Sequence, residues 1–373
     1  MSYLAVQGQQ SMTLDTRRNK AYMEALARVI TPESIVLDLG AGLGIHGLLA
    51  AKLGAKKVYL VEPEDIIVVA REIARDNSFS DRICCLQGKI EEVDIPESVD
   101  VIVSVFTGNF LLEEDLLPSL FYARDKYLKP NGVMIPDVAV MEAVPVNAPN
   151  LHQQEIACWS KTHLGIDHRK ARSYASNSLY YYNKELADAK YLAVPSQLKT
   201  MDFYQSRSTH CQVEVKQRII ESGLCHGWAG WFKMRLGEAW LSTAPHEPSL
   251  HWSAVFLPLD PPIEVEANEE VLFRLQRPPF GEWSWQVKTR TFQKQHSTFF
   301  AVPMTLKTVK KMAVDYQPQL DIKGKAALFV LSHCKGDISV RQLADRVKHD
   351  YSDLFITDEE ALTFVQNLIA SFG

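Results

Sequence analysis

Residues 35–62 read IVLDLGAGLGIHGLLAAKLGAKKVYLVE, and they determine the fold class predicted for the first part of the chain. Residues 35–37 form a short apolar run that is typical of a strand buried on both faces. The glycine-rich segment 40–44 predicts a turn, because residues without Cβ allow a sharp bend and the close approach of a ligand. Helical periodicity over residues 45–53 and a second apolar run at 58–61 complete the pattern. The segment therefore predicts the first strand, turn, helix and strand of a Rossmann-like α/β domain.

The spacing of this turn distinguishes between nucleotide cofactors. A dinucleotide fingerprint has the form G-x-G-x-x-G, whereas this segment reads D-x-G-x-G-x-G, with Asp38 ahead of Gly40, Gly42 and Gly44. That variant is typical of sites for S-adenosylmethionine (SAM), which has no pyrophosphate to place on the helix. Glu62 ends the second strand, where a carboxylate can accept both ribose hydroxyls. We therefore predict a SAM site, and the alternative is a glycine-rich turn in an unrelated α/β protein.

The bulk composition narrows the class of protein. The chain has 373 residues, enough for two or three domains, and its 46% hydrophobic and 23% charged residues are ordinary for globular proteins. A net charge of −5 does not favour nucleic-acid binding, and no apolar run reaches the length of a membrane span. No signal peptide opens the sequence. The cysteines include no C-x-x-C pair, so we predict a cytoplasmic protein with reduced thiols and no metal site: Cys84, Cys85, Cys158, Cys211, Cys225 and Cys334.

Residues 10–30 supply the first candidate cofactor contacts outside the turn. Met12, Asp15, Arg18 and Tyr22 fall at helical spacing, so we expect them on one face of a helix. Arg18 could reach the amino-acid carboxylate of the cofactor with its forked guanidinium. The alternative is a solvated surface arginine.

A second candidate lies beyond the third predicted strand, residues 81–86. The turn at residues 89–92 falls where adenine usually lies in this layout, and Glu91 could accept a hydrogen bond from the adenine amino group. A solvated acidic turn explains the same residues, so both interpretations stay open.

Three successive carboxylates follow the fourth predicted strand, residues 99–104. Glu113, Glu114 and Asp115 are expected at the carboxyl edge of the sheet, where ligands bind in open α/β folds. The alternative is that they form the acidic first turn of a helix beginning near Glu113, which the helix dipole would favour.

The rest of the chain predicts two domains beyond a cofactor domain at residues 1–145. Residues 146–305 suggest an antiparallel sandwich or barrel, because short strand-like runs alternate with turns, and residues 155–200 within them suggest a helical arm. His251 lies in a loop of this region, where it either faces the cofactor cleft or packs against Trp252. Residues 306–373 contain three short helical segments, two with capping-box spacing, which suggests a winged-helix-like domain.

Taken together, these motifs resemble the protein arginine methyltransferases over about residues 1–305. The resemblance implies a Rossmann-like SAM domain, a β-barrel domain and a helical dimerisation arm, normally in a head-to-tail homodimer. It assigns Arg18 to the SAM carboxylate, Glu62 to the ribose and Glu91 to the adenine. The matching segments include M-x-x-D-x-x-R-x-x-x-Y at 12–22, VLDLGAGLG at 36–44, KIEEV at 89–93, ARDKYLKP at 123–130 and LHW at 250–252.

One departure from the family pattern concerns the acceptor site. The family has a loop in which two glutamates clamp a guanidinium; here Glu114 stands at the second position, but Val105 replaces the first. Losing a charged partner to a desolvated guanidinium costs on the order of 2–5 kcal/mol. A substitute is therefore expected, and Glu113 or Asp115 could supply it. His251 would close the acceptor pocket or carry the released proton.

The predicted reaction is in-line transfer of the SAM methyl group to a guanidino nitrogen of arginine in a peptide, protein or free amino acid. Two alternatives remain open: methylation of a non-arginine amine or modified peptide side chain in natural-product biosynthesis, and a catalytically silent SAM-binding partner. Residues 306–373 resemble, more weakly, the winged-helix modules that bind peptide in enzymes modifying ribosomally made peptides. Such a module would raise the local concentration of a peptide substrate.

Overall fold

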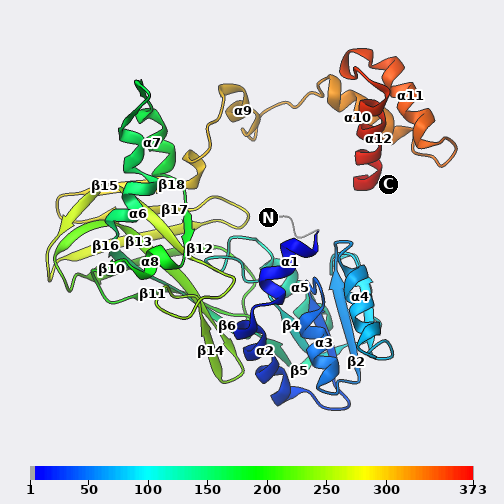
Figure 1. Ribbon diagram of the computed structural model, residues 1–373, viewed down its shortest axis with the longest axis horizontal. Coiled ribbons are helices and arrows are strands. Elements are labelled where there is room, and N and C mark those ends of the chain that lie inside the picture. Colours follow the sequence, from blue (N-terminus) through cyan, green and yellow to red (C-terminus); the bar gives the residue numbers. More distant parts are fainter. Residues whose placement is uncertain (1–4, 373) are drawn as a thin grey trace. The chain divides into compact units, whose positions relative to one another are not determined.

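The computed structural model describes residues 5–372, and the chain divides into two compact units, Met1–Pro303 and Met304–Gly373 (Figure 1). Each unit has a hydrophobic core of its own, so each is described separately. The first unit contains a parallel sheet with covering helices, followed by antiparallel sheets.

The parallel sheet has five strands in the order β3-β2-β1-β4-β5, and every pairing in it is parallel. The strands are β1 Ile35–Leu39, β2 Lys57–Glu62, β3 Ile83–Gln87, β4 Val99–Ser104 and β5 Leu128–Ile135. β1 is buried at every position, as its apolar run predicts. The strand order reverses between β1 and β4, and ligands bind outside the carboxyl ends of strands at such a switch point. The predicted Rossmann-like fold is confirmed.

The helices of this sheet are α1 Val6–Thr13, α2 Thr16–Val29, α3 Ile45–Lys52, α4 Ile67–Asp76 and α5 Leu117–Tyr127. The single helix expected over residues 10–30 is wrong, because the chain breaks into α1 and α2 at Asp15. The Asp15 carboxylate caps α2 by accepting a hydrogen bond from the backbone N–H of Arg18 at 2.9 Å.

Antiparallel sheets make up the rest of the first unit, as the alternating pattern predicts. Together these sheets are called the barrel below. One sheet has seven strands, with the path β10-β6-β13-β15-β9, β11 paired to β6 and β14 paired to β13; the other has the order β12-β16-β17-β18. Their bounds are β6 Val138–Asn147, β9 Tyr180–Tyr182, β10 Lys190–Tyr191, β11 Ser196–Asp202, β12 Cys211–Arg218, β13 Gly223–Leu236, β14 Ala239–Ser242, β15 Ala254–Val265, β16 Glu270–Arg277, β17 Ser284–Lys288 and β18 Gln293–Ser297.

The expected arm is an excursion between β6 and β9, and Figure 1 shows its helix α7 projecting from the end of the antiparallel sheets. Its elements are short, and a two-stranded ribbon lies between its helical pieces. In chain order this region contains α6 Pro149–Glu155, η1 Ala157–Ser160, β7 Thr162–His163, β8 Ile166–Asp167 and α7 Arg169–Ala175, with α8 Lys184–Ala187 following β9 and η2 Thr298–Phe300 following β18.

The second unit is a small helical domain with helices at the predicted positions. Both predicted capping boxes form: Ser339 and Gln342 bond reciprocally at the start of α11, and Thr357 and Glu360 do so at the start of α12. No strand forms among residues 304–372, so the likeness to a winged helix is confined to the helices. These are α9 Leu306–Lys311, α10 Ile322–Ser332, α11 Val340–Asp350, η3 Ser352–Leu354 and α12 Asp358–Phe372.

Candidate functional site

The glycine turn connects β1 to α3 at the switch point of the parallel sheet. Gly40, Gly42 and Gly44 all have positive φ, at 69°, 53° and 78°, a region that other residues adopt only with strain. A Cβ on Gly40 would lie 2.1 Å from the ring of Phe106, and one on Gly42 would lie 2.7 Å from the side-chain oxygen of Gln9. The turn is therefore covered by a side chain from the loop after β4 and by one from α1.

Two carboxylates fix the backbone around this turn. Asp38 is buried in β1 and accepts a hydrogen bond from the N–H of Gly47 in α3 at 2.7 Å, and burial raises its pKa to about 7. Glu62, at the end of β2, accepts hydrogen bonds from the N–H groups of Gly42 at 2.8 Å and Glu64 at 3.1 Å. Burial raises the pKa of Glu62. Each carboxylate oxygen has a second lone pair, so Glu62 can still accept hydroxyl groups.

Arg18 supplies a buried positive charge beside the turn. Its side chain is almost fully buried, and its guanidinium donates to the carbonyl oxygen of Met12 at 2.6 Å and to the side chain of Asn19 at 3.0 Å. Among residues 5–372 it has no carboxylate within ion-pair distance. A buried guanidinium bonded only to neutral groups is suited to an anionic ligand group. Met12 contributes its backbone carbonyl, and its side chain is only half-buried.

The turn predicted to contact adenine, at residues 89–92, lies at the same edge of the sheet. The N–H of Gly88 donates to the backbone carbonyl of Glu62 at 3.0 Å, which ties the turn to the ribose end of the predicted site. Glu91 follows in this turn and its side chain is exposed, whereas Ile90 is buried beneath it.

Asp15 and His251 form a second polar centre near Arg18. The Oδ2 atom of Asp15 accepts from the backbone N–H of His251 at 2.9 Å and lies 3.2 Å from its Nδ1. Burial lowers the pKa of His251. Burial opposes ionisation of Asp15, but hydrogen bonds from His251 and Arg18 outweigh it and hold its pKa at about 2. His251 is therefore neutral at pH 7, with Nδ1 donating and Nε2 available as an acceptor.

The acidic loop between β4 and α5 is not the start of a helix, since α5 begins at Leu117, so the helix expected near Glu113 is wrong. Its carboxylates bond to the antiparallel sheets instead. Glu113 accepts from the indole N–H of Trp283 at 2.7 Å, and Asp115 accepts from the guanidinium of Arg277 at 2.7 Å. These long-range contacts replace the helix-dipole stabilisation that the sequence pattern suggested.

Glu114 lies in the same loop, where it packs against Gly108. A Cβ on Gly108 would lie 2.8 Å from its Cγ, so the glycine leaves room for this side chain. Val105 is the first residue after β4 and is half-buried. The ring of the next residue, Phe106, covers Gly40. The loop that carries Glu114 is thus in direct contact with the predicted cofactor turn.

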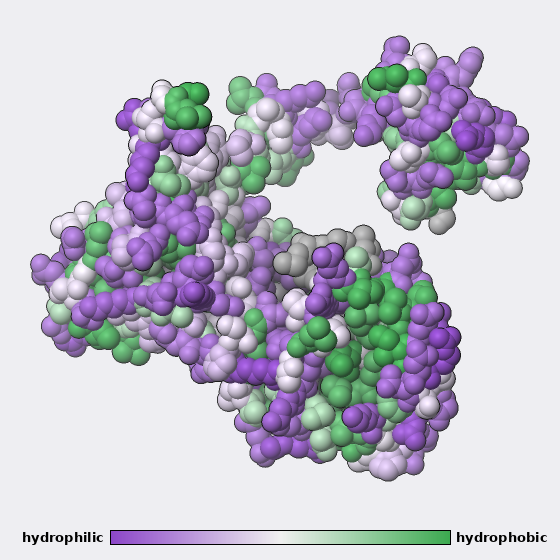
Figure 2. All heavy atoms as spheres, in the orientation of Figure 1, coloured by the Kyte–Doolittle hydropathy of each residue, from purple (hydrophilic) through white to green (hydrophobic). Residues whose placement is uncertain are grey.

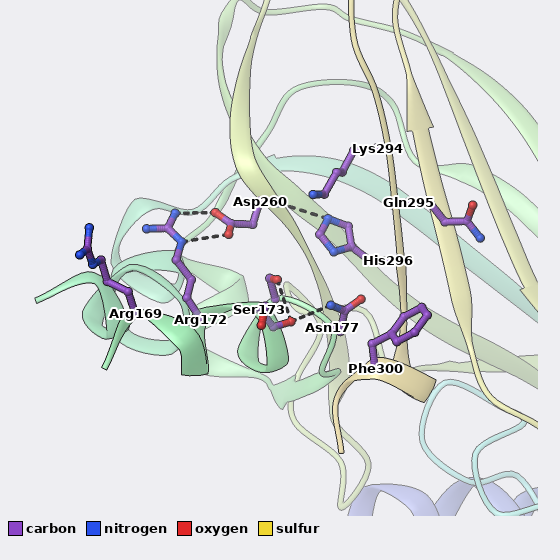
Figure 3. A pocket seen from close by; sticks show the side chains of 10 residues that line it. Arg169, Arg172, Ser173, Asn177, Asp260, Lys294, Gln295, His296 and Phe300 are labelled. Carbon is purple, nitrogen blue, oxygen red and sulfur yellow. Dashed lines mark hydrogen bonds and ion pairs between the residues drawn. The ribbon is translucent and has the colours of Figure 1, made fainter. Parts of the chain in front are cut away.

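A separate cavity of about 350 Å³ lies where the arm meets β15 and β18 (Figure 3). Arg172 of α7 points to Asp260 and donates to its Oδ2 at 2.9 Å, and the Asp260 N–H donates to His296 at 3.4 Å. These hydrogen bonds join the arm to the barrel, so we interpret the cavity as structural.

Sequence reasoning missed several residues of the site because each reaches it from a distant part of the chain. Gln9 and Phe106 cover the turn, and Tyr181 reaches the acidic loop from β9. No local motif marks Gln9, Phe106 or Tyr181. His46, which follows the glycine turn directly, was also missed; its ring packs at a tilt against Tyr22, with centroids 4.3 Å apart.

Comparisons of the sequence with known families agree with this geometry. Residues 137–286 match the family described as "Arginine methyltransferase oligomerization subdomain", and residues 19–136 match "Ribosomal protein L11 methyltransferase (PrmA)". Protein arginine N-methyltransferase 6 of Xenopus tropicalis is 33% identical over 286 residues, which are 72% of this chain and 83% of that protein. The histone-arginine methyltransferase CARMER of Anopheles gambiae is 32% identical over 280 residues, 70% of this chain and 44% of that protein.

Solved structures give the same result for the fold. The Trypanosoma brucei PRMT1 enzyme-prozyme heterotetrameric complex with AdoHcy matches with a TM-score of 0.73 and 27% identity, covering 80% of this chain and 99% of that one. The Arabidopsis thaliana protein arginine methyltransferase 10 matches with a TM-score of 0.68 and 26% identity, covering 79% and 99%. Both matches span the sheet that carries the glycine turn and the antiparallel sheets together.

Proposed function

This chain belongs to the protein arginine methyltransferase family and is a SAM-dependent methyltransferase, and on that premise we propose that it methylates a guanidino nitrogen of arginine in a peptide, protein or free amino acid. The observation that carries the proposal is the contact between the glycine turn and the acidic loop, made by Phe106 and Gly40. It brings a cofactor site and a carboxylate for the acceptor to one edge of the sheet. Nothing in residues 5–372 favours the two alternative functions.

The proposed cofactor contacts follow from the buried charges around the turn. Arg18 would bind the amino-acid carboxylate, Glu62 the ribose hydroxyls, and Glu91 the adenine amino group. Gly40, Gly42 and Gly44 allow the backbone to approach the ligand, and Asp38 fixes the turn through Gly47. Met12 holds Arg18 through its carbonyl. The bound cofactor would supply an electrophilic methyl group on its sulfonium.

The acceptor would be oriented by carboxylates of the acidic loop. Glu114 would bind the guanidinium and draw positive charge away from the attacking nitrogen. Glu113, held by Trp283, would keep the loop in place and add negative potential. His251, neutral through burial, has Nε2 available to take up the proton that the methylated nitrogen releases.

The proposal is tested by incubating the purified chain with SAM and three acceptors: an arginine peptide, the same peptide with lysine in place of arginine, and free arginine. Mass spectrometry should show a methyl group on the arginine peptide and none on the lysine peptide. Glu114→Gln should abolish transfer while S-adenosylhomocysteine (SAH) still binds. Methylation of the lysine peptide alone, or an unchanged rate for Glu114→Gln, would contradict the proposal.

The oligomer that we propose is a homodimer formed through the arm. Leu164 and Ile166 are 88% and 60% exposed at its tip, and Figure 2 shows a second hydrophobic surface over α3 and α4, where Val68 is exposed. Two exposed apolar surfaces would promote aggregation of a monomer. In a head-to-tail dimer, each surface of one chain can be covered by the other surface of its partner. The matched oligomerization subdomain supports an assembly of this kind.

We further propose a cytoplasmic location and a peptide-holding role for the second unit. No helix among the described residues is long and apolar enough to cross a membrane.

The second unit exposes the apolar side chains of Leu328, Leu331 and Ile356 on a folded core, which suits an extended apolar ligand. Removing residues 304–373 should then raise KM for long peptides and leave KM for free arginine unchanged.

A further inference from the structure

Tyr181 is the central residue of the short strand β9, and it lies where the arm returns to the barrel. β9 pairs with the start of β15, with Tyr181 opposite Val255. The acidic loop contacts the same stretch of β15, because the side chain of Asn109 accepts from the backbone N–H of Ser253 at 3.0 Å. The ring of Phe110 also reaches this region, close to Gly230. Tyr181 is therefore beside the acidic loop.

The hydroxyl group of Tyr181 has an unusual environment. Its oxygen is buried, and no group among residues 5–372 lies in good hydrogen-bond geometry to it, although the Glu113 carboxylate is close enough to act on it. Burial raises the pKa of Tyr181 above its ordinary value, and the nearby carboxylates of Glu113 and Glu114 raise it further. The phenol is therefore protonated at all physiological pH values. Glu113 can only accept from the phenol O–H, so the buried oxygen still lacks a donor. A buried acceptor without a donor costs free energy, so a donor from outside the chain is expected.

The neighbours of this hydroxyl are held in place by the antiparallel sheets. Glu113 is bonded to Trp283, and Asp115 to Arg277, whose side chain is almost fully buried. Neither carboxylate can turn to the acceptor without leaving a buried donor unpaired. Both carboxylates are therefore held away from the position that Val105 leaves without a carboxylate, and we expect another group there.

We propose that the Tyr181 hydroxyl accepts a hydrogen bond from a guanidinium N–H of the methyl acceptor, replacing the carboxylate lost at Val105. The inference rests on the proposed arginine methylation. The acceptor is then bound by one carboxylate, Glu114, and one neutral hydroxyl. A hydroxyl can accept from an N–H and donate to a carboxylate at the same time. This pairing fits a planar group with several N–H donors, which is the guanidino group, better than an ammonium.

The test compares Tyr181→Phe with Tyr182→Phe. Tyr182 is the adjacent residue, but its hydroxyl donates to Glu155 at the arm, so it is a matched control. With saturating SAM and an arginine peptide, Tyr181→Phe should raise KM by about 10-fold or more, as expected for one hydrogen bond to a charged group. Tyr182→Phe should stay within about twofold of the native chain. SAH affinity, measured by calorimetry, should be unchanged in both.

A second measurement separates acceptor binding from a structural role. In a chain that also carries Val105→Glu, the restored carboxylate can take the same N–H, so adding Tyr181→Phe should raise KM by less than about threefold. A merely structural hydroxyl would cost the same in both backgrounds. The proposal is overturned if Tyr181→Phe leaves KM unchanged, or if its effect is equal in both backgrounds. If the native chain binds SAH but methylates no guanidino group, the proposed function itself fails, and this inference fails with it.

Discussion

The carboxylate of Asp15 contacts His251 twice, at 2.9 Å to its backbone N–H and at 3.2 Å to Nδ1 of its imidazole, although the two residues are 236 positions apart in the chain. The other carboxylate oxygen of Asp15 caps α2. One side chain therefore begins the helix that carries Arg18 and orients the histidine of the barrel loop. Asp15 thus connects Arg18, which we propose binds the cofactor, to His251, which we propose serves the acceptor.

Asp15→Asn should shift the acidic limb of the pH–rate profile to lower pH. Burial lowers the pKa of His251, and the Asp15 carboxylate partly opposes that effect by stabilising the imidazolium. Removing the charge should lower the histidine pKa further and reduce the plateau rate by about 10-fold or more. Asparagine still caps the helix, so stability should change little. An acidic limb that stays in place or moves to higher pH would contradict the assigned role of His251.

The same pair gives a pH dependence of stability with a defined sign. Burial lowers the pKa of His251 in the folded state below its ordinary value of 6.5. Its contribution to stability is therefore fully present above pH 6.5 and is lost as the pH falls towards the folded pKa. Asp15, with a pKa of about 2 against 3.8, adds a second loss only below pH 3.8.

Glu62→Gln should weaken SAH binding by about 10- to 100-fold, because an amide nitrogen replaces one of the oxygens that would accept the ribose hydroxyls. Burial already raises the pKa of this carboxyl, so the loss of its charge should cost the fold little. Calorimetric titration with SAH measures the effect. Glu64→Gln is the control, since Glu64 contacts Glu62 only through its backbone N–H. Equal affinities for the two variants would rule out the ribose contact.

Val105→Glu should increase kcat/KM for an arginine peptide by about 10-fold or more, because it restores a second carboxylate for the guanidinium. Val105→Gln, of similar size and without charge, should give no comparable gain. Initial rates over a range of peptide concentrations, with thermal unfolding as a check of the fold, distinguish the two. A decrease for both variants in well-folded protein would mean that position 105 does not face the acceptor.

Asp115→Ala should destabilise the first unit by about 3–5 kcal/mol, because it leaves the buried guanidinium of Arg277 without its partner. Urea unfolding measures the loss. Glu238→Ala breaks an exposed ion pair with Arg28 and should cost less than about 1 kcal/mol. The hydrogen bond from Arg277 lowers the pKa of Asp115, so its stabilisation should be present above pH 3.8 and lost as the pH falls further.

Leu164→Glu combined with Ile166→Glu should convert the chain to a monomer. Both side chains are exposed at the tip of the arm, and charges there would be buried without partners in a dimer. Sedimentation velocity measures the change, with Leu306→Glu, an equally exposed substitution in the second unit, as the control. If the native chain sediments as a monomer at micromolar concentration, the homodimer is wrong.

Sequence reasoning was most successful where structure depends on local pattern. The strand at residues 99–104 was predicted at its observed bounds, and both capping boxes of the second unit formed as expected. Periodicity and capping act over a few residues, so a single sequence contains the information needed to find them.

The errors arose where distant residues determine local conformation. Glu113 and Asp115 resembled the first turn of a helix, but Trp283 and Arg277, more than 160 residues away, hold them in a loop. Tyr181 could not be assigned to the site without the pairing of β9 with β15. Such partners have no signal in the local sequence.

The hydrogen bonds from Trp283 and Arg277 hold the acidic loop from outside the parallel sheet, so acceptor placement and cofactor affinity depend on different parts of the chain. In the proposed site, cofactor affinity would depend on the edge of the parallel sheet, whereas the placement of Glu114 would depend on the hairpin formed by β16 and β17. Substitutions in that hairpin would then change which arginines are accepted while leaving the affinity for SAM intact.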